Sequence, residues 1–322
     1  MIYKLKENRV ERTYLGGKNL DIMNGKANPK DSYLPEDWIC SLIYANNLSD
    51  SGKSGMTMLA DEDKSLLDLF KEHNFDTDSI NVLVKYLDSG INLQPQLHPT
   101  GELAREYFQK PRGKDEFYYI LETYADDSCI YLGFKEDADR AKITAAIADQ
   151  DMDYIYSVMN RVEVKKGDCL FIPSGLIHSI GKDILMIEVM EMSDLTFRIK
   201  FEPETKEYNL IGQTPEQVVD IFLKKEATNP DDMLRRAGTI SSDTIEKLTK
   251  GKFRIKKETT SEPLTCPSGA CIVLTVEGEG QIAVGGEKRD YNKYDRFVSL
   301  PQEGEEVTFI PQSPTELLFV MI

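Results

Sequence analysis

The sequence is poor in histidine, in tryptophan and in positive charge. Only three histidines and one tryptophan occur in 322 residues. The 39 lysines and arginines are outnumbered by 55 aspartates and glutamates, which gives a formal net charge of −16. Such a negative field opposes nonspecific binding to nucleic acid, and no basic stripe with interleaved aromatic residues is found. We therefore expect no nucleic-acid partner.

Long apolar runs are also missing. No run approaches the roughly 20 residues that a membrane-spanning helix requires, so we expect no membrane partner. The opening Met-Ile-Tyr-Lys-Leu-Lys-Glu-Asn-Arg lacks the apolar core of a signal peptide. The five cysteines are odd in number and form no Cys-x-x-Cys pair, which favours reduced thiols. These absences predict a cytoplasmic protein, long enough for one large or two modest domains.

The chain is organised around residues 167–181, which read Gly-Asp-Cys-Leu-Phe-Ile-Pro-Ser-Gly-Leu-Ile-His-Ser-Ile-Gly. This pattern predicts a strand, a tight turn at Pro173 and Gly175, and a returning strand. We expect residues 169–172 to pair with residues 184–189, and His178 to face into a barrel. One histidine on an apolar strand is more often a core residue than a ligand. However, the spacing Gly-x5-Pro-x-Gly-x2-His resembles the second motif of the cupins, which are jelly-roll barrels that hold a metal.

A second motif lies upstream, in Gln94-Pro-Gln-Leu-His-Pro99 and in the segment that follows it. Alternate side chains of a strand share one face, so Gln96 and His98 can both point inward, and Glu116 can face the same interior. With His178, this set offers two imidazole nitrogens, one carboxylate oxygen and one amide oxygen. Zinc accepts such donors, and iron or manganese would accept them too. The remaining histidine, His73, lies among charged residues and is expected on a solvated helix.

Three motifs together resemble type I mannose-6-phosphate isomerase. They are Gln-x-His-Pro at 96–99, Gly-Lys-x-Glu-x-x-Tyr-Ile at 113–120 and Ile-Pro-x-Gly-x-x-His-x-Ile-Gly at 172–181. The likeness runs, with gaps, over about residues 10–200. It implies one divalent metal per chain, with zinc expected and Fe²⁺ or Mn²⁺ less favoured. The implied ligands are Gln96, His98, Glu116 and His178.

The resemblance also implies an enzyme that interconverts mannose 6-phosphate and fructose 6-phosphate by proton transfer through an enediol. Its partner would then be a small-molecule sugar phosphate. Arg198 matches the active-site arginine of the family, and Lys114 shares the face of Glu116, so we take both as candidate catalytic residues. Lys85, Lys114 and Gln94 are the candidate substrate contacts. Each lysine considered alone could equally be a solvated surface residue, and the sequence does not assign the general base.

Departures from the family pattern leave the exact sugar open. Gln94 stands where many members carry serine, Thr100 stands where aspartate is usual, and Ile-Lys-Phe-Glu follows Arg198. The alternatives are an isomerase of another sugar or sugar phosphate, and a non-catalytic sugar-binding cupin. The chain is expected to be a monomer or a homodimer.

We predict a mostly β protein with two cupin-type jelly-roll barrels. Residues 1–205 would form the metal-binding barrel, with helical insertions at about 61–75 and 137–159. Residues 206–251 would form a helical connector, in which Thr214-Pro-Glu-Gln217 is a capping box. Residues 252–322 would form a barrel without metal, because no histidine follows His178. We expect hairpin turns there at residues 277–280 and 285–286.

Overall fold

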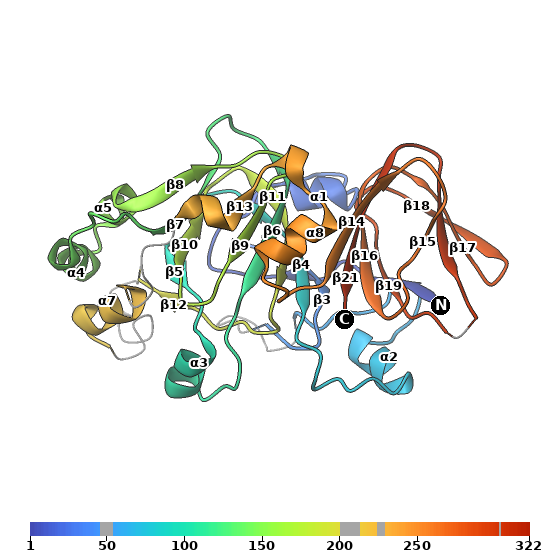
Figure 1. The fold of residues 1–322 in the computed structure, drawn as a ribbon, viewed down its shortest axis with the longest axis horizontal. Helices are drawn as coiled ribbons and strands as arrows, with labels where there is room; N and C mark the ends of the chain where they lie inside the picture. Colours follow the sequence, from blue (N-terminus) through green and yellow to red (C-terminus); the bar gives the residue numbers. More distant parts are fainter. Residues whose placement is uncertain (46–53, 200–212, 224–228, 303) are drawn as a thin grey trace.

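The computed structural model describes residues 1–45, 54–199, 213–223, 229–302 and 304–322. Two β-barrels lie side by side, and short helices cover their ends and their junction (Figure 1). Each barrel is built from two antiparallel sheets. The predicted fold class, mostly β with two jelly-roll barrels and helical additions, is confirmed.

The first barrel consists of a seven-stranded and a five-stranded sheet. In spatial order, the seven-stranded sheet contains β13 (Leu234–Arg235), β9 (Cys169–Ile172), β6 (Glu116–Thr123), β11 (Ile184–Met190), β4 (Leu83–Ser89), β3 (Glu36–Cys40) and β2 (Arg9–Val10). The five-stranded sheet contains β12 (Phe197–Arg198), β5 (Gln96–Leu97), β10 (Ile177–Ile180), β7 (Cys129–Phe134) and β8 (Met159–Glu163).

The second barrel consists of a five-stranded and a four-stranded sheet. The former contains β1 (Ile2–Lys4), β19 (Arg296–Ser299), β16 (Cys271–Glu277), β21 (Thr315–Met321) and β14 (Ile255–Thr260). The latter contains β15 (Leu264–Thr265), β20 (Val307–Pro311), β17 (Gly280–Val284) and β18 (Glu287–Tyr291). The N-terminal strand β1 therefore belongs to a sheet of the C-terminal barrel, through its pairing with β19.

The predicted pairing of residues 169–172 with residues 184–189 is wrong. Strand β9 pairs with β6 and β13, and β6 lies between β9 and β11. At the bend, where Gly175 has a φ of +81°, the chain crosses to the other sheet instead of folding back on the same one. Residues 277–280 likewise connect β16 and β17 of different sheets, whereas residues 285–286 form the predicted hairpin between β17 and β18.

The sheet that faces the second barrel is buried on both sides. Along β6, Tyr118 and Ile120 point into the first barrel, whereas Phe117 and Tyr119 pack in a core shared with β16 and β21. Successive side chains of a strand alternate between the two faces, so both sets must be apolar. This explains why β6 and β11 read as nearly continuous hydrophobic runs.

The helices match the predicted insertions in place but are shorter. They are α1 (Asn19–Met23), α2 (Leu66–Glu72), α3 (Gly101–Phe108), α4 (Arg140–Asp149), α5 (Met152–Ser157), α7 (Pro215–Leu223) and α8 (Ser242–Leu248), with the 3₁₀ helices η2 (Pro230–Met233) and η3 (Ala237–Thr239). Helix α2 begins only after Ser65, whose side chain caps it. The predicted capping box of α7 is present, because Gln217 N–H donates to Thr214 Oγ1 and Thr214 N–H donates to Gln217 Oε1.

The predicted domain boundaries stay a prediction. Parts of the proposed connector, residues 206–212 and 224–228, lie outside the described residues. Within the described part, α7 packs on α4 at the far end of the first barrel, and the short strand β13 joins that barrel's sheet. Helix α8 contributes Ile245 and Leu248 to the core between the barrels. The connector is therefore built into both barrels.

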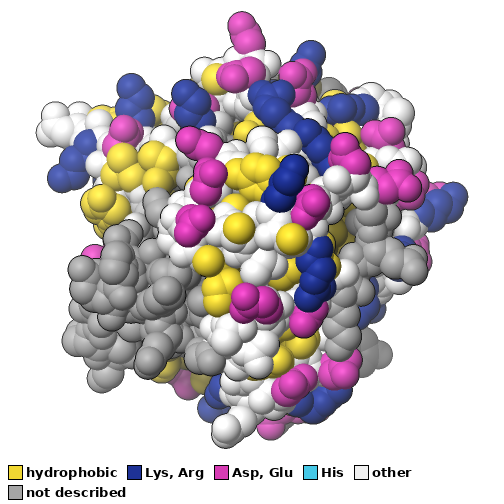
Figure 2. Space-filling model, turned by 90° about the vertical axis from the view of Figure 1, so that its left-hand side faces the viewer, with side chains coloured by type: hydrophobic (Ala, Val, Ile, Leu, Met, Phe, Trp, Pro, Cys, Tyr) yellow, Lys and Arg dark blue, Asp and Glu magenta, His cyan; other side chains and the backbone are white. Residues whose placement is uncertain are grey.

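The surface carries both signs of charge. Over the described part of the face at the α4, α5 and α7 end, Lys and Arg side chains are interspersed with Asp and Glu (Figure 2). All five cysteines are buried free thiols. Among the described helices, none combines the length and the apolar character needed to cross a membrane.

Candidate metal centre

Three strands bring the candidate ligands together inside the first barrel. His178 on β10 lies opposite Gln96 on β5, and His98 follows that strand directly. Glu116 is the first residue of β6, in the facing sheet. The ligand atoms of His98, Glu116 and His178 all lie within 4.8 Å of one another, and the three side chains are buried.

Hydrogen bonds determine which nitrogen of each histidine faces the centre. Nδ1 of His98 lies 2.9 Å from the carbonyl oxygen of Leu195, and Nδ1 of His178 lies 3.0 Å from that of Leu176. A carbonyl oxygen only accepts, so each Nδ1 carries a proton and donates it. In a neutral ring, the Nε2 lone pair then points at Glu116, over 2.9 Å from His98 and 3.6 Å from His178.

The electrostatics of these groups favour a bound cation. Burial lowers the pKa of His98, and burial together with the neighbouring His98 lowers the pKa of His178 to about 4. Burial alone would raise the pKa of Glu116, but the adjacent Lys114 ammonium holds it well below its usual range. Two nitrogen lone pairs and a carboxylate facing one another repel unless a positive charge lies among them. The donor set and its backbone-anchored imidazoles fit a zinc-type ion.

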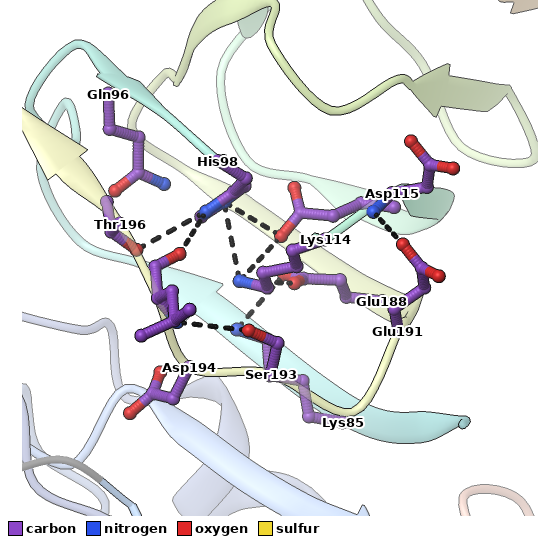
Figure 3. Close-up of polar contacts among 12 residues, drawn as sticks. Lys85, Gln96, His98, Lys114, Asp115, Glu188, Glu191, Ser193, Asp194 and Thr196 are labelled. Atoms are coloured by element: carbon purple, nitrogen blue, oxygen red, sulfur yellow. Dashed lines mark hydrogen bonds and ion pairs between the residues drawn. The ribbon is translucent and has the colours of Figure 1, made fainter. Parts of the chain in front are cut away.

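Gln96 lies beside the three ligands but presents its amino group. Its Nε2 is 3.5 Å from Nε2 of His178, and a metal would require the amide oxygen at that position. Rotating the carboxamide by half a turn exchanges the two atoms, and such orientations are assigned from the surrounding hydrogen bonds. Gln96 as a ligand therefore stays a prediction (Figure 3).

A network of buried lysines and glutamates adjoins the ligands (Figure 3). Lys114 Nζ lies 2.8 Å from Glu116 Oε1 and 3.3 Å from His98 Nε2. Lys85 Nζ lies 3.3 Å from Glu36 Oε1 and 3.2 Å from Glu188 Oε2. Both lysines are at most 4% exposed, so neither has the solvated surface role that was the alternative reading.

One carboxylate oxygen of Glu188 has no hydrogen-bond partner among the described residues. This oxygen, Oε1, is buried, and the ammonium of Lys114 lies 3.9 Å from it. Burial and repulsion from Glu116 raise the pKa of Glu188 to about 8. A carboxylate oxygen that is desolvated and unpaired is costly, so this atom is a position where a further donor or a cation would be stabilising.

A second ion-pair cluster lines the same pocket. Arg12 lies 2.9 Å from Glu36 Oε2 and 3.0 Å from Asp194 Oδ1, and its guanidinium stacks on Trp38 at 5.2 Å from the ring centroid. The hydroxyl of Tyr14 donates to Glu36 over 2.5 Å. Burial would raise the pKa of Glu36, but Arg12 and Lys85 hold it well below its usual range. The cluster thus fixes the N-terminal segment against the segment that contains Asp194.

These residues enclose a small pocket. Seven of the eight predicted site residues line it, and the eighth, His178, has its Nε2 3.6 Å from Glu116; the seven are Lys85, Gln94, Gln96, His98, Lys114, Glu116 and Arg198. The cavity volume left between the described residues is about 40 Å³, enough for only a few water molecules. Binding of a hexose phosphate therefore requires side chains of this pocket to move.

Comparison with known proteins identifies the family. No family model matches the chain. The relative named "Probable mannose-6-phosphate isomerase GmuF", from Bacillus subtilis, is 30% identical over 230 residues, covering 70% of each chain. The chain belongs to the mannose-6-phosphate isomerase family. Another B. subtilis member of this family, "Mannose-6-phosphate isomerase ManA", is 25% identical over 244 residues, covering 73% of this chain and 75% of its own.

Solved structures with mannose 6-phosphate isomerase in their names share the fold. The mannose 6-phosphate isomerase of B. subtilis superposes with a TM-score of 0.72 at 18% identity, over 100% of this chain and 99% of that one. A mannose 6-phosphate isomerase bound with zinc and yttrium superposes with a TM-score of 0.64 at 14% identity, over the whole of both chains. These likenesses concern the architecture of both barrels.

Within this mannose-6-phosphate isomerase family member, sequence reasoning did not single out Glu188, Glu36 or Arg12. A signal for Glu188 was available, because it is the only charged residue in the strand Ile-Leu-Met-Ile-Glu-Val-Met. A lone carboxylate in an apolar strand is unlike a solvated residue and indicates a buried ion pair. Glu36 and Arg12 carried no comparable signal, because each has polar neighbours in sequence.

Proposed function

We propose that the protein is a metal-dependent mannose-6-phosphate isomerase and that its metal is zinc. The proposal is supported most by one observation, the convergence of two backbone-anchored imidazoles on the ionised Glu116 inside a pocket lined by cations. The names of the relatives support the reaction, and the zinc in one structural relative supports the metal. His98, Glu116, His178 and Gln96 would hold the ion, which when bound supplies Lewis-acid polarisation of substrate oxygens.

Isomerisation of an aldose to a ketose moves one proton from C2 to C1, while the oxygens of the two carbons exchange hydroxyl and carbonyl character. A base must remove the C2 proton and return it to C1. We assign this role to Glu188. Among the carboxylates that line the pocket, Glu116 is a candidate ligand, and Glu36 and Asp194 are held by Arg12. Glu188 alone of these four has an oxygen without a hydrogen-bond partner among the described residues.

Arg198 is the candidate phosphate contact. It lines the pocket from β12, paired with Gln96 across the strands, and it is only partly buried. Lys85 and Lys114 are already engaged by carboxylates of the site. A protein of net charge −16 needs a local cation to attract a dianionic phosphate. We therefore separate the roles, with Arg198 at the phosphate and Lys114 beside the reacting carbons.

The first experiment is metal analysis of the purified protein together with a coupled assay on mannose 6-phosphate and a panel of other aldoses and aldose phosphates. We expect one zinc per chain and the highest kcat/KM with mannose 6-phosphate. If another sugar were turned over with a higher kcat/KM, that sugar would replace mannose 6-phosphate as the proposed substrate. Stoichiometric metal without turnover of any sugar would favour a non-catalytic sugar-binding cupin.

The separation of roles has its own test. Arg198→Met removes a charge-assisted contact worth about 1.5–3 kcal/mol, so kcat/KM for mannose 6-phosphate should fall roughly tenfold to 150-fold. The loss with free mannose should be much smaller, because free mannose has no phosphate to hold. Lys114→Met should reduce kcat/KM for both sugars by similar factors. If kcat/KM of the Lys114 variant fell only for the phosphorylated sugar, Lys114 would be a phosphate contact instead.

A further inference from the structure

The ammonium of Lys114 contacts the candidate ligands in the way that a bound metal ion would. Its ammonium contacts two candidate ligands at once, Glu116 Oε1 at 2.8 Å and His98 Nε2 at 3.3 Å, and the side chain is 3% exposed (Figure 3). Because Nδ1 of His98 donates to a backbone carbonyl, Nε2 is the acceptor for this ammonium. The lysine thus uses the same carboxylate and the same imidazole lone pair that a divalent ion would use.

A divalent ion and this ammonium are incompatible at these distances. An ion bound to Nε2 of His98 takes the lone pair that now accepts from Lys114, and it repels the ammonium at close range in a buried site. The ammonium cannot simply be released to solvent, since it is enclosed by the barrel and a buried, unpaired charge is costly. Metal binding therefore requires another acceptor within reach.

Such an acceptor is present. Glu188 Oε1 lies 3.9 Å from Lys114 Nζ and has no hydrogen-bond partner among the described residues. The other oxygen of Glu188 is already 3.2 Å from Lys85. A shift of the ammonium by about 1 Å would bring it to the 2.7–2.9 Å typical of a charge-assisted hydrogen bond. The pocket leaves about 40 Å³ free, so a movement of this size needs no change of the barrel.

We propose that Lys114 is an exchangeable counter-cation, which pairs with Glu116 in the metal-free protein and with Glu188 once the metal is bound. The metal and the ammonium then compete for the Glu116 carboxylate. Loading of the metal brings the ammonium to one lone pair of Glu188 Oε1, and the second lone pair of that oxygen stays available to the substrate proton. The inference rests on the proposed function for the presence of a metal, but the movement of the lysine is a separate claim.

Zinc affinity is the first test. Zinc is titrated into the metal-stripped full-length chain at pH 8 in competition with a chelating dye. Lys114→Met should bind zinc about tenfold more tightly than the unmutated chain, because a like charge beside the ligands is removed. Lys85→Met is the matched control, since it removes a buried ammonium that contacts Glu36 and Glu188 and no candidate ligand among the described residues. Its effect should be clearly smaller.

A double-mutant cycle tests the destination of the lysine. Glu188→Gln should weaken zinc binding in the unmutated background by a larger factor than in the Lys114→Met background, because only the former loses a place for the ammonium. Equal factors in both backgrounds would overturn the exchange. If Lys114 only held Glu116 in position, Lys114→Met would weaken zinc binding instead of tightening it.

A crystallographic test needs no variant. In crystals of the unmutated chain with and without zinc, the distance from Lys114 Nζ to Glu188 Oε1 should contract from 3.9 Å to below about 3.2 Å on loading. An ammonium that stays in contact with Glu116 beside a bound zinc ion would overturn the inference and leave the proposed function intact. Failure of every form to bind zinc would overturn both together.

Discussion

The two barrels have the same layered architecture and opposite interiors. The second barrel is filled by apolar and aromatic side chains, in which Phe309 packs edge-on against Tyr291, Phe297 and Phe319. The first barrel is apolar only in part, around Tyr118 and Ile120. Its remaining interior holds two lysines, three glutamates and two histidines, all nearly fully buried.

The difference shows that an interior built from charged groups lowers the stability of the fold. Burying ionised groups is unfavourable unless each finds a partner, and an apolar replacement of similar volume is often as stable or more stable. In the first barrel, the lysines and glutamates form a connected set of ion pairs, and Glu188 Oε1 is left open. The aromatic interior of the second barrel carries no such cost, which agrees with a purely structural role. Substitutions should therefore affect metal and activity in one barrel and stability in the other.

The largest effect is expected for His98→Ala. Removing a ligand should reduce metal affinity by more than about 100-fold, the upper range for residues that only support a ligand, and activity should fall to background. Near-native melting is expected, because the two barrels supply most of the core. Atomic absorption and circular dichroism measure the two properties. Stoichiometric metal in this variant, or an anomalous signal within residues 252–322, would contradict the contrast between the barrels.

A smaller but still large effect is expected for Glu188→Gln. If this carboxylate moves the proton, kcat should fall by about 10²–10⁴-fold while the chain stays folded. The matched control is Glu316→Gln, which alters a carboxylate bonded to Tyr119 and Lys257 at the junction of the barrels. Its kcat should equal that of the unmutated protein. A Glu188 variant with unchanged kcat would require another base.

Phe309→Ala should affect stability and leave metal binding and activity unchanged. Truncating this fully buried ring should lower the free energy of unfolding by about 3–5 kcal/mol, through lost burial and the cavity left behind. Metal content and kcat of the folded protein should not change, since the ring lies in the other barrel. Urea unfolding followed by fluorescence gives the first quantity. Phe309→Leu should recover most of the stability, and loss of metal in either variant would mean that the barrels are strongly coupled.

The smallest effect is expected for Tyr119→Phe, which removes one hydrogen bond between the barrels. The hydroxyl donates to Glu316 over 2.5 Å. Because Glu316 keeps its ion pair with Lys257, the free energy of unfolding should fall by only about 1 kcal/mol. Two separate unfolding transitions in this variant would indicate that this contact, and not the shared apolar core, couples the barrels.

Local features of the fold could be predicted from residues close in sequence. The strands with branched and aromatic side chains, the hairpin at residues 285–286 and the capping box at Thr214 depend on neighbours within a few positions. The same holds for the candidate ligands, whose spacing within short motifs reflects the alternation of side chains along a strand. The resemblance to the family then added the identity of the chemistry.

Pairing between strands could not be predicted in the same way. β6 and β11 are apolar on both faces, so their sequences do not indicate which neighbour lies on either side. For this reason the predicted pairing of β9 is wrong, and the sequence did not predict that β1 pairs with β19. The open oxygen of Glu188 depends on the same long-range arrangement, because Lys85 and Lys114 approach it from two different strands.

The sequence by itself determined the candidate metal ligands, because ligand type and side-chain alternation are properties of short segments. The tertiary structure alone decided their electrical state and their connections. It turned two lysines that could have been solvated into buried partners of Glu116 and Glu188, and it aimed two imidazole lone pairs at one carboxylate. These outcomes depend on burial and on long-range contacts, such as that of Lys114 with His98, 16 positions away, and that of Lys85 with Glu188, 103 positions away, to which no local pattern is sensitive.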